Sequence, residues 1–307
     1  MDSEARALVV LLGPTGVGKS GVALGLAGKF RGEIVSADSM QVYRGFDIGT
    51  AKPSPADRRT IPHHLLDVVE PGNQFTAADF VAGALEAMAG IHGRDCLPFI
   101  VGGTGLYIKA LLDGLFPGPG RNPEVRRRLE AEAAVEGLEA LHRRLEAVDP
   151  AYALKVRARD RIRIVRALEV FETTGKPISE HFRGTESFVK DLRQVRIGLE
   201  LDRPTLVRRI EERVDRMFAA GLVEEVERLL ARGVAADAPP FKGLGYKQAL
   251  SFLRNEIGLD EARDLVKRET RHYAKRQMTW FRKMSGITWF PPGDRSGLED
   301  HMEKNIQ

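Results

Sequence analysis

The segment Gly13-Pro14-Thr15-Gly16-Val17-Gly18-Lys19-Ser20 constrains the fold of this chain more than any other feature of its sequence. It matches G-x-x-x-x-G-K-S and lies between the apolar run 8–12 and a stretch with helical spacing of apolar residues, 19–30. In such a loop, backbone N–H groups and the N-terminus of the following helix face phosphate oxygens, while the lysine reaches the phosphates. The Ser20 hydroxyl can bind Mg²⁺. The sequence therefore predicts a strand–loop–helix unit that binds a polyphosphate, without specifying which one.

Further strand and helix patterns follow this unit. Short apolar runs predict strands at 33–37, 64–69 and 97–101, with a helix at 77–92 before the last of these. The alternating segment 195–201 predicts a strand that rejoins the same sheet. Repeated strand–helix units predict an α/β fold, a P-loop kinase-like parallel sheet flanked by helices.

The pattern changes at Phe116-Pro117-Gly118-Pro119-Gly120, where a domain boundary is predicted. From Asn122 onward the pattern is helical, and a helix over 160–174 ends at Gly175. We predict a catalytic core formed by 1–120 and 191–307, with a helical insertion domain at 121–190. Helices are also predicted at 205–219, 222–231, 246–256 and 260–284. The last dozen residues, rich in Asp, Glu and Ser, are expected to be poorly ordered.

The strand at 97–101 does not end as it does in a standard nucleotide-hydrolysing P-loop enzyme. Such an enzyme has an Asp after an apolar strand to position Mg²⁺, whereas here Gly102-Gly103-Thr104-Gly105 follows. This difference weakens the ATPase interpretation. Thr104, at the carboxyl end of a parallel strand, would face the ligand crevice and bind a phosphate or a nearby substrate group. Alternatively, its hydroxyl caps the following helix.

Asp38 directly follows the predicted strand 33–37 and is therefore expected at the same edge of the sheet. A carboxylate there can help to hold a metal ion or accept a proton from an attacking nucleophile. Capping of a helix is the alternative. In the loop that follows, Gln41 carries groups suited to paired hydrogen bonds with an adenine edge, and Tyr43 carries a ring that can stack on a base.

Composition excludes several classes of protein. The 47 Lys and Arg exceed the 43 Asp and Glu by too little, a net charge of +4, to diagnose nucleic-acid binding. The single cysteine, Cys96, excludes an internal disulfide framework and makes a Cys-based zinc site implausible. The start of the chain does not resemble a signal peptide, and no apolar stretch approaches the roughly 18 residues that cross a bilayer. We expect a cytoplasmic protein. Adjacent His63 and His64 face opposite sides of a strand, which argues against a metal site.

Several ordered segments together resemble the bacterial tRNA dimethylallyltransferase (tRNA isopentenyltransferase) family. An ordinary small kinase would share only the first of them. The resemblance extends over about residues 8–290 and is carried by the segments 13–20, 36–53, 63–67, 102–107, 166–170, 243–246 and 273–280.

This resemblance implies that the N6 amine of the adenosine just 3′ of the anticodon attacks the first carbon of dimethylallyl pyrophosphate, and that pyrophosphate leaves. It implies Asp38 as the general base on the amine, with Thr104 and Arg213 as further residues at the reacting groups. Arg213 taken alone is equally well explained as a solvated helix charge. Residues 13–20 would form the pyrophosphate cradle, with Mg²⁺ on Ser20. An amine within a stem-loop reaches a buried site only if its base is splayed out.

The resemblance also implies contacts with the tRNA anticodon stem-loop. They would be made by Asp38, Ser39, Met40, Gln41, Thr104, Arg126, Ile162, Arg163, Ile164, Val165, Arg166, Lys242, Gly243, Leu244, Gly245, Tyr246 and Lys247. Two basic runs, 155–166 and 267–283, are candidate phosphate tracks, the second with Tyr273, Trp280 and Phe281 interleaved. A solvated helix face is the alternative for each run.

Two other function classes remain as alternatives to prenyl transfer. One is an ATP-dependent P-loop kinase acting on a small molecule or nucleoside. The other is a nucleotide-gated RNA-binding module without transfer chemistry. For any of these functions we expect a monomer without membrane contact.

Overall fold

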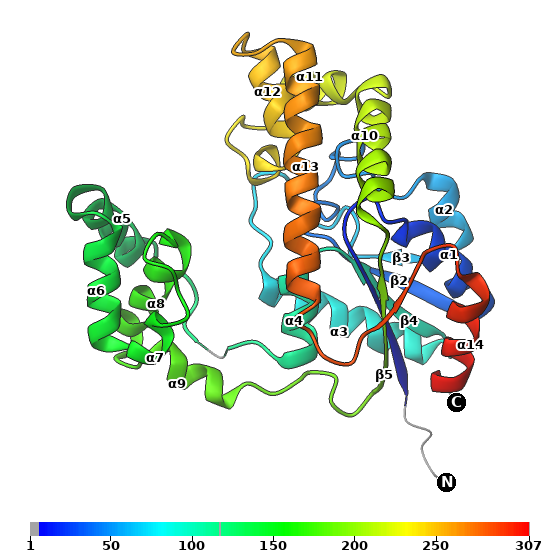
Figure 1. Ribbon diagram of the computed structural model, residues 1–307, viewed down its shortest axis with the longest axis horizontal. Helices are drawn as coiled ribbons and strands as arrows, with labels where there is room; N and C mark the ends of the chain where they lie inside the picture. Colours follow the sequence, from blue (N-terminus) through cyan, green and yellow to red (C-terminus); the bar gives the residue numbers. More distant parts are fainter. Residues whose placement is uncertain (1–5, 117, 307) are drawn as a thin grey trace. The chain divides into compact units, whose positions relative to one another are not determined.

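The computed structural model describes residues 6–116 and 118–306, and by its contacts the chain divides into two compact units. The first combines Met1–Ala110 with Val189–Gln307, and the second is Leu111–Phe188. Of the predicted boundary segment 116–120, residue 117 lies outside the described residues. Figure 1 shows the sheet within the first unit and an all-helical second unit.

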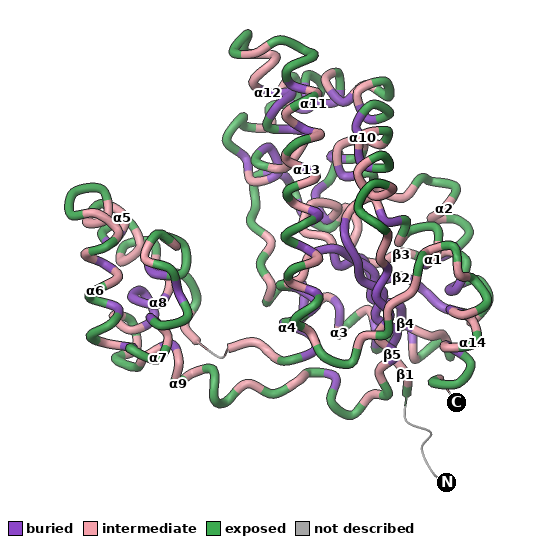
Figure 2. Tube along the Cα trace, viewed as in Figure 1, coloured by how far each residue is buried: buried purple, intermediate pink, exposed green. Residues whose placement is uncertain are grey.

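A parallel sheet of six strands forms the centre of the first unit, in the order β3-β2-β4-β1-β5-β6. This confirms the predicted α/β class. The strands are β1 (Ala7–Leu12), β2 (Gly32–Ala37), β3 (His63–His64), β4 (Leu97–Gly102), β5 (Arg193–Leu199) and β6 (Thr288–Phe290). Strand β5 pairs with β1, so the chain after residue 189 does rejoin the sheet. The strands β1, β2 and β4 are almost entirely buried, as expected for parallel strands covered on both faces (Figure 2).

Two helices near opposite ends of the chain cover one face of the sheet. Helix α1 (Lys19–Lys29) and α14 (Arg295–Ile306) pack their apolar side chains against Val9, Phe99 and Ile197. Helix α3 (Ala77–Gly93) packs against β2 and β4, and α4 (Gly105–Asp113) follows β4. The short helix α2 (Pro55–Thr60) precedes β3.

Four helices from the C-terminal part of the chain complete the first unit. These are α10 (Arg203–Ala219), α11 (Leu222–Ala231), α12 (Tyr246–Leu253) and α13 (Leu259–Phe281), with a short 3₁₀ turn η2 at Pro239–Lys242. In Figure 1, α10 and α13 stand side by side, and these two helices pack against each other. Their apolar residues recur at helical spacing, which explains why their positions are close to those predicted.

Two predictions about local structure were wrong. The strand predicted at 64–69 is confined to His63–His64, because Leu65 and Asp67 have left-handed backbone conformations, with φ of 60° and 56°. Residues Arg295–Ile306 form helix α14 instead of a poorly ordered tail, since Leu298 and Met302, one turn apart, are buried against the sheet.

The second unit is a small helical bundle with its own core. It contains α5 (Pro123–Glu136), α6 (Leu138–Val148), α7 (Pro150–Ala153), α8 (Arg161–Thr174), α9 (Ile178–His181) and the 3₁₀ turn η1 (Phe182–Gly184). Asn122 caps α5 through its side chain, and α8 ends at Gly175, which adopts a φ of 70°. Across residues 6–116 and 118–306, no helix combines the length and apolarity that crossing a bilayer requires.

Candidate active site

The carboxyl ends of three neighbouring strands lie at the same level of the sheet. Leu12 of β1 and Ala37 of β2 are both in register with Gly102 of β4. The segments that follow these residues are the phosphate-binding loop, Asp38, and Gly103-Thr104. They therefore meet at one edge of the sheet, where parallel α/β proteins bind ligands.

The phosphate-binding loop adopts the conformation its glycines permit. Gly16 and Gly18 have φ of 83° and 106°, and a Cβ on Gly16 would come within 2.9 Å of the Ile210 side chain. Gly18 precedes α1, so the N-terminus of that helix faces the loop. Lys19 Nζ donates to the carbonyls of Gly13 and Pro14 at 2.9 and 3.0 Å. Val17 is fully buried and anchors the loop to the core.

Lys19 lies in an unusual electrostatic environment. Burial, and next the positive charge of Arg213, lower its pKa to about 8, while Asp38 acts in the opposite direction. Burial likewise lowers the pKa of the Arg213 guanidinium, with Asp38 again opposing the shift. Lys19 of the loop and Arg213 of α10 are therefore both close enough to the Asp38 carboxylate to interact with it electrostatically. A pocket that destabilises its own cations is suited to an anionic ligand.

The Asp38 carboxylate is held by its own loop. Its Oδ1 accepts hydrogen bonds from the backbone N–H of Met40 at 2.9 Å and of Gln41 at 3.4 Å. Within the described residues, Oδ2 receives none. The Thr104 hydroxyl accepts a hydrogen bond from Ser39 N at 3.0 Å. The Thr104 hydroxyl thus links the end of β4 to the loop that carries Asp38.

Gln41 and Tyr43, the two side chains predicted to contact a base, differ in whether a ligand in the cavity can reach them. Gln41 lines the cavity, with its side-chain N–H donating to the carbonyls of Thr50 and Ala51 and its oxygen accepting from Ser36. Tyr43 is 5% exposed and packs against Phe46 in a hydrophobic cluster. The expectation that Tyr43 stacks on a base was therefore wrong.

A cavity of about 740 Å³ opens over this edge of the sheet. Its walls come from the phosphate-binding loop, the loop after β2, α10, the segment before α12, and α13. The predicted site residues that line it are Thr15, Gly16, Gly18, Lys19, Ser20, Asp38, Ser39, Met40, Gln41, Arg213, Lys242, Gly243, Leu244 and Tyr246. Arg213 faces the cavity, so it is not merely a solvated helix charge. Lys247 is exposed outside the cavity lining and Gly245 is buried beneath it.

Helix α13 supplies Gln277, whose role was not predicted from the sequence, and Tyr273, which was predicted only as a stacking partner within a basic run. Gln277 accepts a hydrogen bond from Thr15 N and donates to the Gly103 carbonyl, both at 2.8 Å, and so ties together two loops of the site. Burial, and next the charge of Asp38, raise the pKa of Tyr273 to about 12. Thr270, Tyr273 and Gln277 are spaced 3 and 4 residues apart on one helix face. Polar residues at that spacing on a buried helix face are the sequence feature that could have indicated this part of the site.

The second basic run is only partly available to RNA. Lys267 pairs with Asp215 at 2.7 Å and Arg271 with Glu211 at 2.5 Å, whereas Lys275 and Arg276 are exposed. Phe281 is fully buried, so the expectation that it stacks with RNA was wrong.

The predicted contact residues of the second unit fall into two groups. Ile162 and Arg163 are exposed, whereas the side chains of Ile164 and Val165 are buried in that unit's core. Arg126 and Arg166 both pair with Glu169, at 2.7 and 3.0 Å, and Glu169 is completely buried.

A family model described as IPP transferase matches residues 41–284 of this chain. The chain is 52% identical over 289 residues to the tRNA dimethylallyltransferase of Geobacter metallireducens, covering 94% of this chain and 93% of the relative. It is 44% identical to that of Thermomicrobium roseum, covering 99% and 93%.

Solved structures give the same result. The tRNA isopentenylpyrophosphate transferase of Bacillus halodurans superposes with a TM-score of 0.71 at 39% identity, covering 97% of this chain and 95% of that one. A eukaryotic dimethylallyltransferase acting on tRNA superposes with a TM-score of 0.81 at 28% identity, covering 98% and 77%. With a phosphate-binding loop and a carboxylate at one edge of its P-loop-like sheet, the chain belongs to the IPP transferase family of prenyltransferases.

Proposed function

We propose that this protein transfers the dimethylallyl group of dimethylallyl pyrophosphate to N6 of the adenosine 3′-adjacent to the anticodon in tRNA, releasing pyrophosphate. One observation carries the proposal. The cationic loop and the Asp38 carboxylate share one cavity, and the central strand β4 is followed by Gly103-Thr104 instead of the Asp that a nucleotide hydrolase uses there. Such a cavity can hold a diphosphate leaving group and deprotonate a nucleophile at the same time.

The transfer step needs one bond to form and one to break. The lone pair of N6 forms a bond to the first carbon of the donor, and the electron pair of the breaking C–O bond goes to pyrophosphate. The amine proton passes to Asp38, whose Oδ2 is the oxygen that backbone amides leave uncovered. Lys19, Arg213 and the amides of residues 16–18 would stabilise the negative charge that grows on the leaving group, and Lys19, Arg213, Gly16 and Gly18 line the cavity.

The acceptor base would enter beside the loop that carries Asp38. Ser39, Met40 and Gln41 line the cavity, as do Lys242, Gly243 and Leu244. Met40 packs directly on Gly243, where a Cβ would come within 2.3 Å of the Met40 methyl. A flipped base that enters at this point therefore requires the flexible Met40 side chain to move aside.

The site also suits Mg²⁺. The Ser20 hydroxyl lines the main cavity and a smaller one of about 50 Å³ that it shares with Ser36 and Asp38. Oxygen donors beside a diphosphate are the surroundings this ion prefers. Ser20 would hold it together with oxygens of the diphosphate, and bound Mg²⁺ would add positive charge next to the leaving group.

In the second unit, we propose that Ile162 and Arg163, with the exposed basic residues of the run 155–166, contact the anticodon stem-loop. For Arg126 and Arg166 the proposal requires that RNA compete with Glu169. We further propose that the enzyme works in the cytoplasm and that it is a monomer. Light scattering of the purified protein tests whether it is a monomer.

The decisive experiment incubates the protein with anticodon stem-loop RNA, Mg²⁺ and dimethylallyl pyrophosphate, followed by mass analysis of the RNA. We expect one five-carbon unit on the adenosine 3′ of the anticodon. Asp38→Asn should lower the rate by about 10² to 10⁴-fold, the usual contribution of a general base. Asp264→Asn, which alters an exposed carboxylate of α13, should leave the rate unchanged. Transfer of the terminal phosphate of ATP, without transfer of a five-carbon unit, would refute the proposal.

A further inference from the structure

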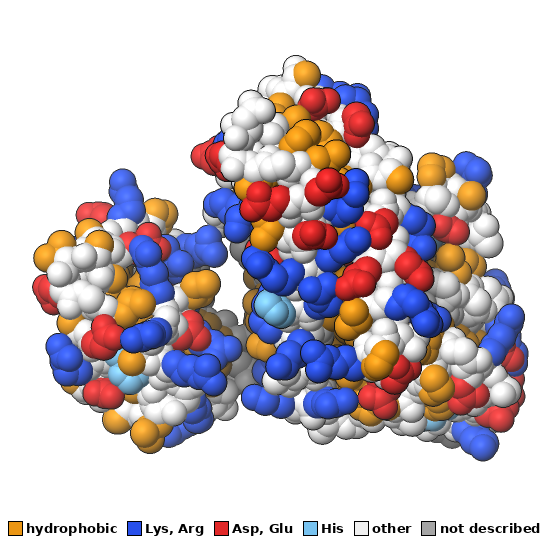
Figure 3. All heavy atoms as spheres, turned by 45° about the horizontal axis from the view of Figure 1, so that its top comes forward, with side chains coloured by type: hydrophobic (Ala, Val, Ile, Leu, Met, Phe, Trp, Pro, Cys, Tyr) orange, Lys and Arg blue, Asp and Glu red, His pale blue; other side chains and the backbone are white. Residues whose placement is uncertain are grey.

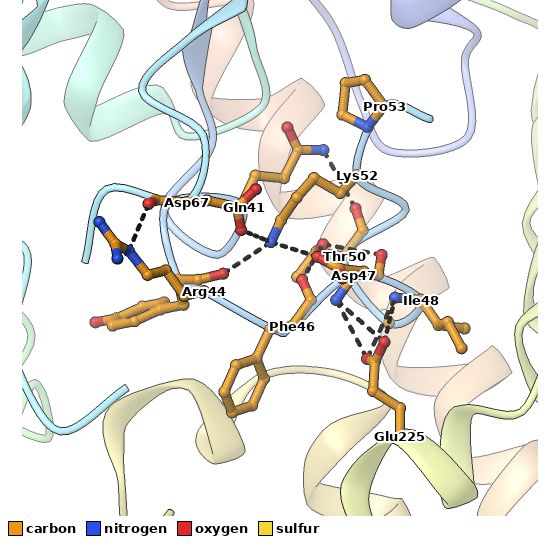
Figure 4. Close-up of polar contacts among 12 residues, drawn as sticks. Gln41, Arg44, Phe46, Asp47, Ile48, Thr50, Lys52, Pro53, Asp67 and Glu225 are labelled. Carbon is orange, nitrogen blue, oxygen red and sulfur yellow. Dashed lines mark hydrogen bonds and ion pairs between the residues drawn. The ribbon is translucent and has the colours of Figure 1, made fainter. Parts of the chain in front are cut away.

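The loop 46–52 forms one wall of the cavity and is held from behind by a buried carboxylate (Figure 4). Gly49, Thr50 and Ala51 face the cavity. The loop is a tight turn in which the Thr50 hydroxyl donates to the Phe46 carbonyl at 2.7 Å. Buried Lys52 pairs with Asp47 and Asp67, both at 2.6 Å, and so fixes the end of the turn.

Glu225 of α11 lies directly beneath this turn. Its carboxylate is 5% exposed and accepts hydrogen bonds from the backbone N–H groups of Asp47 and Ile48 at 3.0 to 3.2 Å. The hydroxyl of Tyr246 donates to the same carboxylate at 2.6 Å and accepts from Gly49 N at 3.1 Å. Three successive amides are thus held by one carboxylate and one phenol.

The hydrogen bonds continue from this turn to Asp38. The carbonyls of Thr50 and Ala51 accept from the Gln41 side chain at 3.3 and 3.4 Å. The backbone N–H of Gln41, in turn, donates to Asp38 Oδ1. An unbroken series of contacts therefore links Glu225 to the carboxylate proposed as the base.

At its other end, the series begins in the segment that faces the acceptor side of the cavity. Tyr246 is fully buried at the start of α12 and directly follows Lys242–Gly245, three of whose residues line the cavity. Its ring also lies against Gly49, where a Cβ would come within 2.5 Å of the ring. A change in the position of 242–246 would therefore be transmitted to the turn 46–52.

Packing alone does not require this arrangement. The surrounding cluster of Phe46, Phe241 and Leu222 is apolar, and a buried carboxylate costs free energy unless its hydrogen bonds are satisfied. An apolar side chain would fill the space but leave the Asp47 and Ile48 amides and the Tyr246 hydroxyl without their acceptor. What Glu225 adds is a single defined conformation of the turn.

We infer that Glu225 and Tyr246 are positioning residues, which couple the RNA-facing segment 242–246 to the orientation of the Asp38 loop. The inference rests on the proposed function. Neither residue touches the phosphate-binding loop in the hydrogen bonds described, so diphosphate binding should not depend on them.

The test uses Tyr246→Phe, which removes one oxygen, and Glu225→Gln, which keeps the shape but replaces an acceptor with a donor. For each we measure kcat and KM for stem-loop RNA, the Kd for dimethylallyl pyrophosphate without RNA, and Tm. We expect kcat to fall by about tenfold for Tyr246→Phe and more for Glu225→Gln, because slight misplacement of a reacting group is costly. The Kd for dimethylallyl pyrophosphate should change by less than about twofold.

Glu33→Gln is the matched control. Glu33 is also a carboxylate with 5% exposure, bonded to Arg94 and His64 at the opposite end of β2 from Asp38. The Glu33→Gln variant should have a lower Tm than the wild type but the same kcat. The double variant Tyr246→Phe with Glu225→Gln should be no slower than Glu225→Gln alone, because both act through one series of contacts.

Two outcomes would overturn the inference. Unchanged kcat in both variants would show that the turn does not need them. If kcat falls in these variants and dimethylallyl pyrophosphate binding weakens by the same factor, the substitutions cause a general loss of structure. The same behaviour in Glu33→Gln would strengthen that conclusion. Either result requires an active wild type, whereas a wild type that transfers no five-carbon unit refutes the proposed function itself.

Discussion

The cations of the cavity and the arginines of the helical unit differ in what balances their charge. Within residues 6–116 and 118–306, no Asp or Glu forms an ion pair with Lys19 or Arg213, although Asp38 acts on both through space. Arg126 and Arg166, in contrast, converge on one buried carboxylate, Glu169. Both units carry many basic side chains interspersed with acidic ones on the face drawn in Figure 3. Abundance of positive charge therefore does not mark a ligand site, whereas a buried cation without a paired acid does.

The largest effect is expected on the stability of the helical unit, where Arg126 and Arg166 both pair with Glu169. Glu169→Gln should destabilise that unit by about 3–5 kcal/mol, because two guanidinium groups lose their buried partner. Hydrogen exchange of the α8 amides measures this loss. Glu172→Gln is the control, since Glu172 pairs with the more exposed Arg128 and Arg144. A loss below about 1 kcal/mol would mean that Arg126 and Arg166 are not committed to structure and are free to bind RNA.

Removal of a cation that lines the cavity should weaken the use of the donor substrate without lowering the stability of the fold. Lys19→Met should lower kcat/KM for dimethylallyl pyrophosphate by about 10² to 10³-fold, the usual result of losing one donor to a developing anion. Tm should not fall, because burial of this charge is unfavourable without a ligand. Lys29→Met, at the other end of α1, alters an exposed lysine paired with Glu299 and Glu303 and should have no such effect.

Arg213→Gln should have a smaller effect on the same quantity. A charge-assisted hydrogen bond contributes about 1.5–3 kcal/mol, which corresponds to roughly 10- to 100-fold in kcat/KM. The exposed neighbour Arg208 lies on α10 outside the cavity lining, so Arg208→Gln serves as the control. Equal effects of the two variants would contradict the assignment of Arg213 to the anion site.

The sequence predicted those parts of the site that are encoded locally. The phosphate-binding loop, Asp38 and Thr104 each directly follow a recognisable apolar strand, and the parallel pairing of those strands is enough to bring them together. The core strands and most helices were predicted for the same reason: each carries its own periodicity.

The rest depended on contacts between distant segments. Gln277 joins Thr15 and Gly103 across more than half of the chain, and nothing near residue 277 indicates those partners. Tyr43 and Phe281 were expected to meet RNA because they are aromatic, yet both are buried by residues far away in sequence. Helix α14 is mostly polar and buries Leu298 and Met302, with Ile306 partly buried, which is too weak a pattern to predict a helix. Periodicity reveals a buried face but does not identify what covers it.

The smallest predicted effect is a pH dependence that tests the comparison without removing a charge by mutation. The pKa of Lys19 is lowered to about 8, so the side chain loses its proton as the pH rises through 8, well below the ordinary value of 10.5. The terminal phosphate of the donor is already ionised there, since its second pKa is about 6. The affinity for dimethylallyl pyrophosphate should therefore fall above pH 8, by at most about tenfold per pH unit for one linked proton.

Arg213 gives this prediction its control, because its charge is the second cause of the lowered pKa of Lys19. In Arg213→Gln the pKa of Lys19 should rise, and the fall in affinity should begin at higher pH, although the affinity itself is weaker. In Lys19→Met the fall should disappear. Calorimetric titrations from pH 7 to 10 distinguish these cases. If the three proteins share one pH profile, the titrating group is not Lys19, and the two cations do not act on each other across the cavity.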